Sequence, residues 1–496
     1  MMKKITKQLL VTGFCLPLAT ISFVITAAKP DKPGKPPVNP PAESTIIDEI
    51  QAELDYIVNS TYTEENKNSK TWRFLQSSDD IFGAINVQRI VPRRTPAGTS
   101  WIRPGEAAMA VVGMMQGIDY LADNGESINT YDSVIDKFFL SWILAHEQGQ
   151  NNDVSSADHG AFMDRTYYNA DGSYAYKVPT WKTDVTAQIM IANWKYYEYN
   201  VNTGQTDQAA DWINSAWSVQ QKAADYLVRM HDTTPAGAIH MLPGNSNESE
   251  YGTWIHFAAN AVPALRSASA WAQKVSVSSS DYDRVANDLI IGIQTMKDTS
   301  HPNYYKYRPY LGNGQYGDPT YGDSIDQLTF SPYETGAISV DAFAKQISDW
   351  WTNGDAEIKM TYETTDPSDW RYFGTHWHYY FNGDPSENNY LYPGPGFQLA
   401  KVEWKHGNAF NDTISIDRSN NRLTWAKSTD YSSLWWFKTK DEEARVPNGF
   451  QDWRNALNYS ETAEDWARFT DTSAYFIELL LMNEAGIDTD YNPILQ

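Results

Sequence analysis

Long segments with apolar residues at three- and four-residue steps dominate this sequence and limit what the chain can fold into. In one of them, Ala107, Val111, Met114 and Ile118 fall on one face of a helix. Alternating patterns that indicate strands are scarce, so we predict an all-α fold, with at most a minor β-hairpin at 413–425 around an Asn-Asn turn. The predicted helices span residues 46–59, 105–124, 131–148, 180–200, 208–230, 253–274, 281–297, 324–351 and 463–484.

The connections between these helices distinguish two helical architectures. Stacked helical repeats have short connections at a fixed spacing. Here the connections follow no fixed period, and they are long and rich in polar and aromatic residues, for example at 150–179 and 299–321. We therefore predict an (α/α)n toroid, a closed barrel of paired helices with long loops.

The N-terminus has the pattern of a secretory signal peptide. A lysine-rich start precedes an apolar run that ends in Ala27 and Ala28. Pro17 interrupts the run, which disfavours the alternative of a retained membrane anchor. We expect residues 1–28 to be removed and the mature protein to be secreted or periplasmic, with no membrane span.

A linker separates this signal from the body of the chain. Residues 29–44 are dense in proline and lysine, a composition that forms an extended spacer rather than a core. No second stretch of this kind follows, so residues 45–496 are expected to form a single toroid domain.

Charge and cysteine content exclude several kinds of protein. The formal net charge of −23 disfavours nucleic acid as a partner, and an acidic ligand would need a locally basic cleft. The single cysteine, Cys15, lies in the predicted signal peptide, so the mature chain has no thiol for a disulfide, a nucleophile or a zinc site. Its stability has to come from a large apolar core.

Aromatic residues make up 14% of the chain, and many of them occur in polar loops. Sugar rings present C–H faces that stack on aromatic side chains, while their hydroxyl groups bond to polar groups nearby. The loops therefore indicate a polysaccharide or oligosaccharide as the ligand. The alternative for any one aromatic residue is that it fills the wide core of a helical ring.

The predicted helix 253–274 carries a polar face opposite its apolar face. His256 and Asn260 are four residues apart on that polar face, so both side chains can reach one point. In a ring of helices such a face lines the cavity. An imidazole and an amide there can bind a sugar carboxylate and lower the pKa of the neighbouring C–H. The alternative is a solvent-exposed histidine and asparagine.

A basic segment with four tyrosines, 301–310, follows this helix. It places Lys306 and Arg308 among phenols that include Tyr305 and Tyr307. A cation can neutralise the carboxylate of a uronic acid, and a tyrosine beside an arginine can act as a base once its pKa is lowered. The alternative is an ordinary loop in which Arg308 pairs with one of the many carboxylates.

Other candidates are spread along the chain. Asp184, near a helix start, is either a first-turn acid or one of the two carboxyl groups that glycoside hydrolysis needs. The second would be Asp326 or Glu334. The pair of histidines at 376 and 378 lacks a third ligand with suitable spacing, so we predict no metal site. The residues assigned to substrate binding are His159, Arg165, Tyr168, Trp181, Lys182, Arg371, His376, His378 and Tyr379.

The helical body and these residue sets resemble the α/α-toroid polysaccharide lyases that act on alginate or glucuronan. In place of the Asn-Asn-His run typical of the alginate lyases, this chain has His256 followed by Asn260. The resemblance implies that Asn260 neutralises the carboxylate and that His256 is a base. It also implies that Tyr305 or Tyr307 is the base or acid at the sugar ring, with Arg308 as a partner of that tyrosine or of the carboxylate.

Three hypotheses follow for the function. The first is a secreted lyase that cleaves a uronic-acid-containing polysaccharide by β-elimination without a cofactor. The second is a glycoside hydrolase on the same barrel that uses paired carboxylates. The third is a non-catalytic glycan-binding protein, in which only the aromatic residues matter. The sequence does not specify an oligomeric state.

Overall fold

The computed structural model shows a ring of helices, and Ser44–Gln496 form one compact unit. Within the part that the structure describes, no helix is long and apolar enough to cross a membrane. The described residues are 45–59, 83–85, 99–144, 149–169, 173, 180–246, 252–297, 305–306, 308, 310–312, 315–318, 330–353, 375–376, 390–427, 450–451, 454–455 and 468–493.

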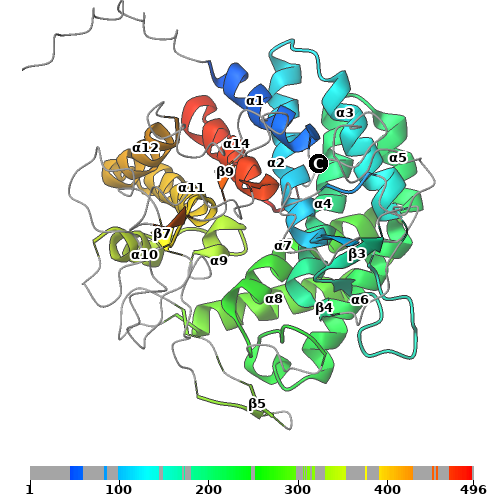
Figure 1. Ribbon diagram of the computed structural model, residues 1–496. Helices are drawn as coiled ribbons and strands as arrows, with labels where there is room; N and C mark the ends of the chain where they lie inside the picture. Colours follow the sequence, from blue (N-terminus) through cyan, green and yellow to red (C-terminus); the bar gives the residue numbers. More distant parts are fainter. Residues whose placement is uncertain are drawn as a thin grey trace, which may run out of the picture. The chain divides into compact units, whose positions relative to one another are not determined.

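Six helices in the described part of the chain form the inside of the ring (Figure 1). They are α2 (Pro104–Asp123), α4 (Thr183–Asn202), α7 (Ile255–Lys274), α9 (Ser331–Glu334), α11 (Pro393–Phe410) and α14 (Thr470–Ala485). In that order each packs against the next, and α14 packs against α2, so the ring closes.

A second set of helices covers the outside of the ring. It comprises α1 (Ile46–Asn59), α3 (Asn129–Asp136) with the π-helix η1 (Lys137–Leu144), α5 (Thr206–Ser215) with α6 (Trp217–Thr233), α8 (Ser280–Thr295), α10 (Ala342–Asn353) and α12 (Thr413–Lys427). Inner and outer helices alternate along the chain, so the inner helices all run in the same direction. This arrangement confirms the predicted all-α toroid of paired helices.

The inner helices are buried around most of their circumference, as helices enclosed on all sides are. In α7, Phe257 and Leu265 are buried on one side, and Asn260 and Ser267 are buried on the other. The hydroxyl of Ser267 donates to the carbonyl of Pro263 at 2.8 Å, which satisfies it without solvent. The polar face predicted for this helix therefore reaches solvent only near the helix start.

Aromatic side chains fill much of the core, as the alternative interpretation of the aromatic content expected. Trp194 on α4 lies 6.2 Å, between ring centroids, from Trp271 on α7, and Trp212 on α5 lies at the same distance from that ring. Phe139 on η1 stacks on Tyr196 at 4.2 Å. Such contacts bury large apolar areas in a chain without disulfide bonds.

The connections differ in length at the two ends of the ring. Those that leave inner helices are short: 124–128, 203–205, 275–279, 335–341 and 411–412. Those that enter inner helices are long: 60–103, 145–182, 234–254, 296–330, 354–392 and 428–469. Because the inner helices are parallel, the described parts of the long connections that precede them lie where these helices begin. We call this the entry end of the ring.

Short strands occur in these long connections, and all of their pairings are antiparallel. Several strands end directly before an inner helix and so fix how the chain enters it. The strands are β1 (Thr99–Ile102), β2 (Phe162–Met163), β3 (Thr166–Asn169), β4 (Trp181–Lys182), β5 (Tyr310–Gly312), β6 (Gln315–Tyr316), β7 (Thr375–His376), β8 (Tyr390–Tyr392), β9 (Phe450–Gln451), β10 (Arg454–Asn455) and β11 (Arg468–Phe469). The pairs are β1 with β3, β2 with β4, β5 with β6 and β9 with β11, and β8 lies between β10 and β7.

The structure corrects two parts of the predicted helix map. The expected hairpin at 413–425 is wrong, because these residues lie in α12, where Ser415, Ser419 and Leu423 are buried at helical spacing. The helix α11 was absent from the prediction. Its buried positions include Lys401 and Glu403, and these charges interrupt the apolar period on which the prediction depended.

Two predicted helices are each split into shorter ones. Residues 208–230 form α5 and α6, which are separated at Ala216, and residues 324–351 contain α9 and α10. The predicted start at residue 180 is also displaced, because Trp181 and Lys182 form the strand β4 before α4 begins.

A C-terminal strap, residues 486–493, bonds to the inner helices. The hydroxyl of Tyr491 donates to carboxylates of Glu334 on α9 and Glu478 on α14, each at 3.0 Å. The side chain of Asn492 donates to the carbonyl of Gly336 at 2.7 Å and accepts from Arg266 on α7, also at 2.7 Å. The strap therefore ties together helices that lie far apart in the sequence.

A buried ion cluster surrounds this strap. The ammonium group of Lys401 on α11 is fully buried, lies 2.7 Å from Glu334 and also bonds to Glu478. Burial opposes its charge, but the two carboxylates outweigh that effect and raise the pKa of Lys401. Glu334 is thus held by a lysine inside the core, so it does not fit the predicted role of a hydrolytic acid.

We expect Lys401→Met to lower the free energy of unfolding by about 3–5 kcal/mol, because it leaves two buried carboxylates without a counter-charge. Lys345→Met is the matched control. Lys345 also lies 3.3 Å from each of two carboxylates, but it is about a third exposed, and such surface pairs contribute about 1 kcal/mol or less. Urea denaturation measures both changes, and equal losses would contradict this account.

Candidate active site

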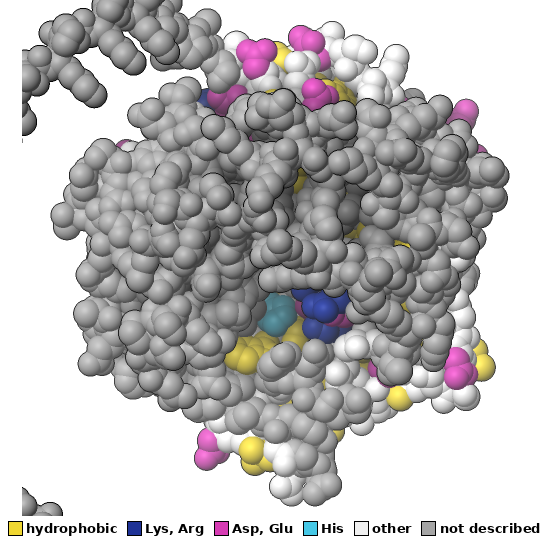
Figure 2. Space-filling model, viewed as in Figure 1, with side chains coloured by type: hydrophobic (Ala, Val, Ile, Leu, Met, Phe, Trp, Pro, Cys, Tyr) yellow, Lys and Arg dark blue, Asp and Glu magenta, His cyan; other side chains and the backbone are white. Residues whose placement is uncertain are grey.

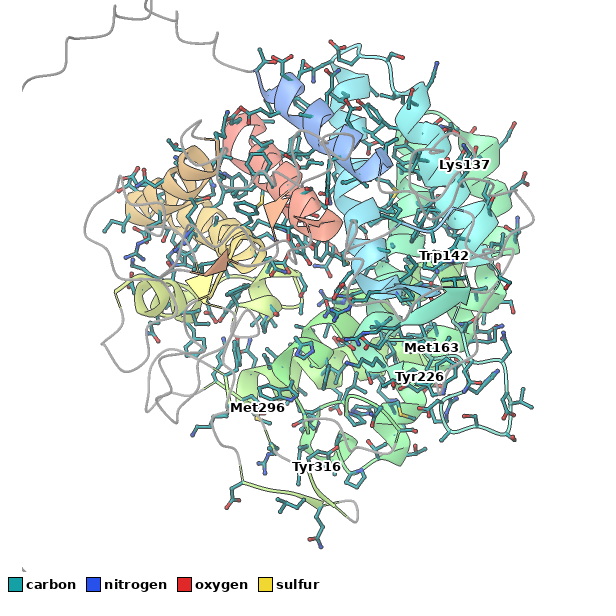
Figure 3. All side chains as sticks on the ribbon, in the orientation of Figure 1. Lys137, Trp142, Met163, Tyr226, Met296 and Tyr316 are labelled. Atoms are coloured by element: carbon teal, nitrogen blue, oxygen red, sulfur yellow. The ribbon has the colours of Figure 1, made fainter. Side chains whose placement is uncertain are left out.

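Two short strand pairs fix the chain where it enters α2 and α4. In the first pair Ile102 lies opposite Thr166, and in the second Met163, labelled in Figure 3, lies opposite Trp181. The two residues between the paired strands, Asp164 and Arg165, are therefore held beside the starts of both inner helices. The backbone N–H of Asp164 also donates to the carbonyl of Thr180 at 2.8 Å.

Charged side chains of alternating sign line these strand ends. Glu106, in the first turn of α2, bonds to Arg103. The carboxylate of Asp164 lies 3.3 Å from Nε of Arg165 and 3.7 Å from Nζ of Lys182. Arg103 and Arg165 each adjoin the last pair of the β1–β3 ladder, Ile102 with Thr166.

The series continues across the starts of α4 and α7. Oδ2 of Asp184, in the first turn of α4, lies 3.6 Å from Nε2 of His256, in the first turn of α7. The side chains of Glu106, Asp184 and His256 are 26%, 20% and 21% exposed, so a ligand at the entry end can reach all three. We call these residues the entry cluster: Arg103, Glu106, Asp164, Arg165, Lys182, Asp184 and His256.

The surroundings of Asp184 favour its ionised form. Burial raises its pKa, but the interaction with His256, the charges of Lys182 and His256, and a hydrogen bond from the backbone of Val185 outweigh burial and bring the pKa to about 2. The helix start adds to this preference because its free N–H groups favour an anion. Asp184 is therefore a carboxylate at any physiological pH.

The surroundings of Glu106 favour its protonated form instead. Burial raises its pKa and Asp164 raises it further, and the nearby Arg103 and Arg165 only partly oppose these effects. A Cβ placed on Gly105 would lie 3.2 Å from Cα of Val185, which shows that α2 and α4 touch at their starts. Two carboxyl groups with opposite pKa shifts thus lie on adjacent inner helices.

The entry end is hollowed where charged residues gather. Figure 2 shows a hollow in which a histidine and basic side chains lie beside an acidic one. Across the residues that the structure covers, no group of three or more His, Cys, Asp or Glu side chains is arranged to hold a metal ion.

Arg308 lies beside the helix that carries His256. Its carbonyl accepts a hydrogen bond from the N–H of Thr253 at 3.0 Å, two residues before α7 begins. Nη1 donates to the carbonyl of Gly317 at 3.2 Å, whereas the buried Nε has no hydrogen-bond partner within the described residues. The backbone of Arg308 therefore lies beside the start of the helix that carries His256. Asn260 is buried one turn further along α7.

Tyr305 does not fit the role of a base. Its ring is 5% exposed and packs edge-on against Phe343, with 5.4 Å between ring centroids. Burial raises the pKa of its hydroxyl, whereas a base needs a lowered one. Tyr307, the other predicted phenol, lies outside the described residues.

The residues predicted to bind substrate fall into three groups. Arg165, Trp181 and Lys182 lie at the entry end, and His159 is half-buried with its carbonyl bonded to Arg229. Tyr168 does not fit its predicted role in substrate binding, because it is fully buried. Its hydroxyl accepts a hydrogen bond from the indole of Trp142, labelled in Figure 3, at 2.9 Å. The structure describes the backbone of His376 on β7 but not its side chain. Four other predicted residues lie outside the described part of the chain: Asp326, Arg371, His378 and Tyr379.

Glu106 was not predicted from the sequence, and Asp164 was assigned no role there. A signal was available for Glu106, because the run Arg103-Pro-Gly-Glu106 places a proline at a helix start and an acid in its first turn. No comparable signal marks Asp164, since only the pairing of β2 with β4 brings it beside Lys182.

Comparisons with known proteins identify the fold. No family model matches the sequence, and no curated protein matches it. Among solved structures, a glycoside hydrolase family 15 glucoamylase from Hypocrea jecorina aligns with a TM-score of 0.54 and 14% identity over 90% of this chain and 73% of that one. A D-mannose isomerase aligns with a TM-score of 0.53 and 10% identity, and an unsaturated glucuronyl hydrolase from Bacillus sp. GL1 with 0.52 and 11%. Both of these alignments cover 91% of this chain and 100% of the other. At such identities the similarity shows the fold alone, and that fold is the α/α toroid.

The low pKa of Asp184 predicts an acid-sensitive part of the stability. An unfolded aspartate takes up a proton near pH 3.8, whereas folded Asp184 does so at about pH 2. The folded state therefore loses free energy of unfolding as the pH falls from about 4 to about 2. Urea denaturation across this range should show a shallower loss for Asp184→Asn than for the wild type. Asp211→Asn, on the surface of α5, is the control, and identical slopes for Asp184→Asn and wild type would contradict the assignment.

Proposed function

We propose that this protein is a carbohydrate-active enzyme that hydrolyses glycosidic bonds, with Glu106 and Asp184 as its two carboxyl groups. The observation that carries the proposal is the placement of these two partly exposed carboxyl groups in the first turns of adjacent inner helices. The opposite directions of their pKa shifts support it. Glycoside hydrolysis needs one carboxylic acid that holds a proton and one carboxylate that has lost it.

The roles follow from these protonation states. Glu106, with its raised pKa, donates a proton to the glycosidic oxygen and so makes it a better leaving group. Asp184 stays ionised and either activates a water molecule or attacks the anomeric carbon, and the distance between the two carboxyl groups decides which. His256 holds the carboxylate of Asp184 in place through its Nε2. This pair retains Asp184 from the sequence-based hydrolase hypothesis, with Glu106 in place of Asp326 or Glu334.

The cations at the entry end support an acidic sugar, such as a uronic acid, as the substrate. Arg165 and Lys182 lie beside Asp164, and Arg308 lies at the start of α7 with a buried Nε that has no partner in the described part of the chain. A carboxylate can accept from such groups. The names of two similar structures, a glucoamylase and an unsaturated glucuronyl hydrolase, support the carbohydrate class. Action outside the cytoplasm, after removal of residues 1–28, remains part of the proposal.

Cleavage by β-elimination is the second candidate. It is favoured by the position of Arg308 next to the helix of His256, because a cation for the carboxylate and an imidazole base are the groups that elimination requires. In this mechanism His256 removes the proton beside the carboxylate, and Tyr305 takes no part because it is buried in the core.

Product analysis on neutral and uronic-acid oligosaccharides and polysaccharides distinguishes these functions. Hydrolysis yields new reducing ends without ultraviolet absorbance, and we expect this result on at least one uronic-acid substrate. Glu106→Gln and Asp184→Asn should each lower kcat by about 10²–10⁴-fold, the typical contribution of a general acid or base. Glu126→Gln, at an exposed glutamate after α2, should have no effect.

The other outcomes each contradict the proposal. A product that absorbs in the ultraviolet would establish elimination instead. Binding of a saccharide without any product would indicate a glycan-binding protein, as in the third hypothesis.

A further inference from the structure

We propose that Thr183 is a positioning residue for this hydrolysis: its hydroxyl ties the start of α4 to the connection that leads into α7, and so holds the carboxylate of Asp184 against His256. The inference rests on the proposed function, because it assigns Thr183 a role relative to a carboxyl group of that reaction. It goes further by naming the contact that fixes the starts of two inner helices relative to each other.

The polar groups of Thr183 bind two consecutive carbonyl groups of that connection. Thr183 is the first residue of α4 and is fully buried, although its neighbour Asp184 reaches solvent. Its hydroxyl donates to the carbonyl of Pro243 at 2.6 Å. The carbonyl of Gly244 lies 3.0 Å from the same hydroxyl and accepts from the backbone N–H of Thr183, also at 3.0 Å. This N–H is one that a helix start leaves without an internal partner.

The segment that supplies these carbonyl groups is itself anchored to the outer helix α8. Nδ1 of His240 lies 2.6 Å from a carboxylate oxygen of Asp288 on α8. The backbones also touch, since a Cβ placed on Gly292 of α8 would lie 1.9 Å from the carbonyl oxygen of His240. Because α8 packs against α7, the segment is fixed relative to the helix that carries His256.

A second threonine holds the other side of the same helix turn. The hydroxyl of Thr186 accepts from the N–H of Phe162 on β2 at 2.9 Å and donates to the carbonyl of Lys182 at 2.6 Å. Asp184 thus lies between two buried hydroxyl groups. Thr186 ties the turn to β2, whereas Thr183 ties it to the connection that precedes His256.

The contact between Asp184 and His256 is sensitive to a small displacement. Oδ2 of Asp184 lies 3.6 Å from Nε2 of His256, already beyond the usual hydrogen-bond range of about 2.7–3.2 Å. Thr183→Val keeps the shape of the side chain but removes the donor to Pro243, so the start of α4 loses a link to the neighbouring connection. A displacement of about 1 Å at a reacting group is enough to lower a rate by about 10²-fold.

The first test is steady-state kinetics of Thr183→Val. We expect kcat to fall by about 10–100-fold, with KM changed by less than about threefold because the groups that bind substrate stay in place. Thr183→Ser restores the hydroxyl and should recover most of kcat. Ser267→Ala is the matched control, because Ser267 is equally buried and donates to a backbone carbonyl at 2.8 Å, but further along α7. Its kcat should equal that of the wild type.

A variant of the anchor on α8 tests the same link from a more exposed position. The side chain of His240 is 43% exposed, and its backbone has a φ of 59°, which asparagine tolerates. His240→Asn shortens the side chain and removes the imidazole from Asp288. We expect it to lower kcat in the same direction as Thr183→Val. It decides the question if Thr183→Val does not fold, and an unchanged kcat would then contradict the inference.

NMR titration of the Asp184 carboxyl group gives a measurement that needs no activity. The interaction with His256 contributes to its pKa of about 2. If Thr183 holds the pair together, Thr183→Val should raise this pKa toward the ordinary value of 3.8, and Ser267→Ala should leave it unchanged. Asp184→Asn assigns the signal.

The outcomes separate this inference from the proposed function. Wild-type kcat and an unmoved titration in Thr183→Val would overturn the inference and leave hydrolysis intact. A loss of kcat that the loss of folded protein in urea denaturation fully explains would also overturn it, because Thr183 would then act on stability alone. Full activity in Asp184→Asn would instead refute the proposed function, while the titration would still test Thr183.

Discussion

The buried ammonium group of Lys401 joins three inner helices at α9, the shortest of the six. Five inner helices are long, but α9 has only 4 residues and forms a single turn. Lys401 binds Glu334 at the end of that turn and Glu478 on α14, and Tyr491 from the C-terminal strap bonds to both carboxylates. Burying these charges is costly unless all of them are paired. The cluster therefore specifies one arrangement of α9, α11 and α14.

Closure of the ring determines where chemistry can occur. Because the inner helices are parallel, their starts and all the long connections lie at one end, where free backbone N–H groups favour anions. Glu106 and Asp184 both occupy first turns there, yet their pKa values shift in opposite directions. The difference arises from their neighbours: His256 and Lys182 outweigh burial at Asp184, whereas burial and the charge of Asp164 outweigh Arg103 and Arg165 at Glu106. Two acidic residues in the first turns of adjacent inner helices thus differ in the protonation state that their surroundings favour.

Much of the fold was predictable from the sequence. The spacing of apolar residues predicted the bounds of four helices, α1, α2, α7 and α8, to within one or two residues. Each of them buries a continuous apolar face. Long connections without a fixed spacing indicated a toroid rather than stacked repeats. The helix α11 was missed because Lys401 and Glu403 occupy buried positions, and the hairpin at 413–425 was expected because an Asn-Asn pair was taken for a turn.

The site was predictable only in part. The sequence alone determined the helix starts that bear His256 and Asp184, since local spacing is enough to identify a helix and its first turn. Tertiary structure decided which groups meet and which are buried: it paired His256 with Asp184, placed Asp164 beside Lys182, and enclosed Tyr168, Tyr305 and Glu334 in the core. These contacts join residues far apart in the chain, and protonation depends on such neighbours and on burial, neither of which a local pattern contains.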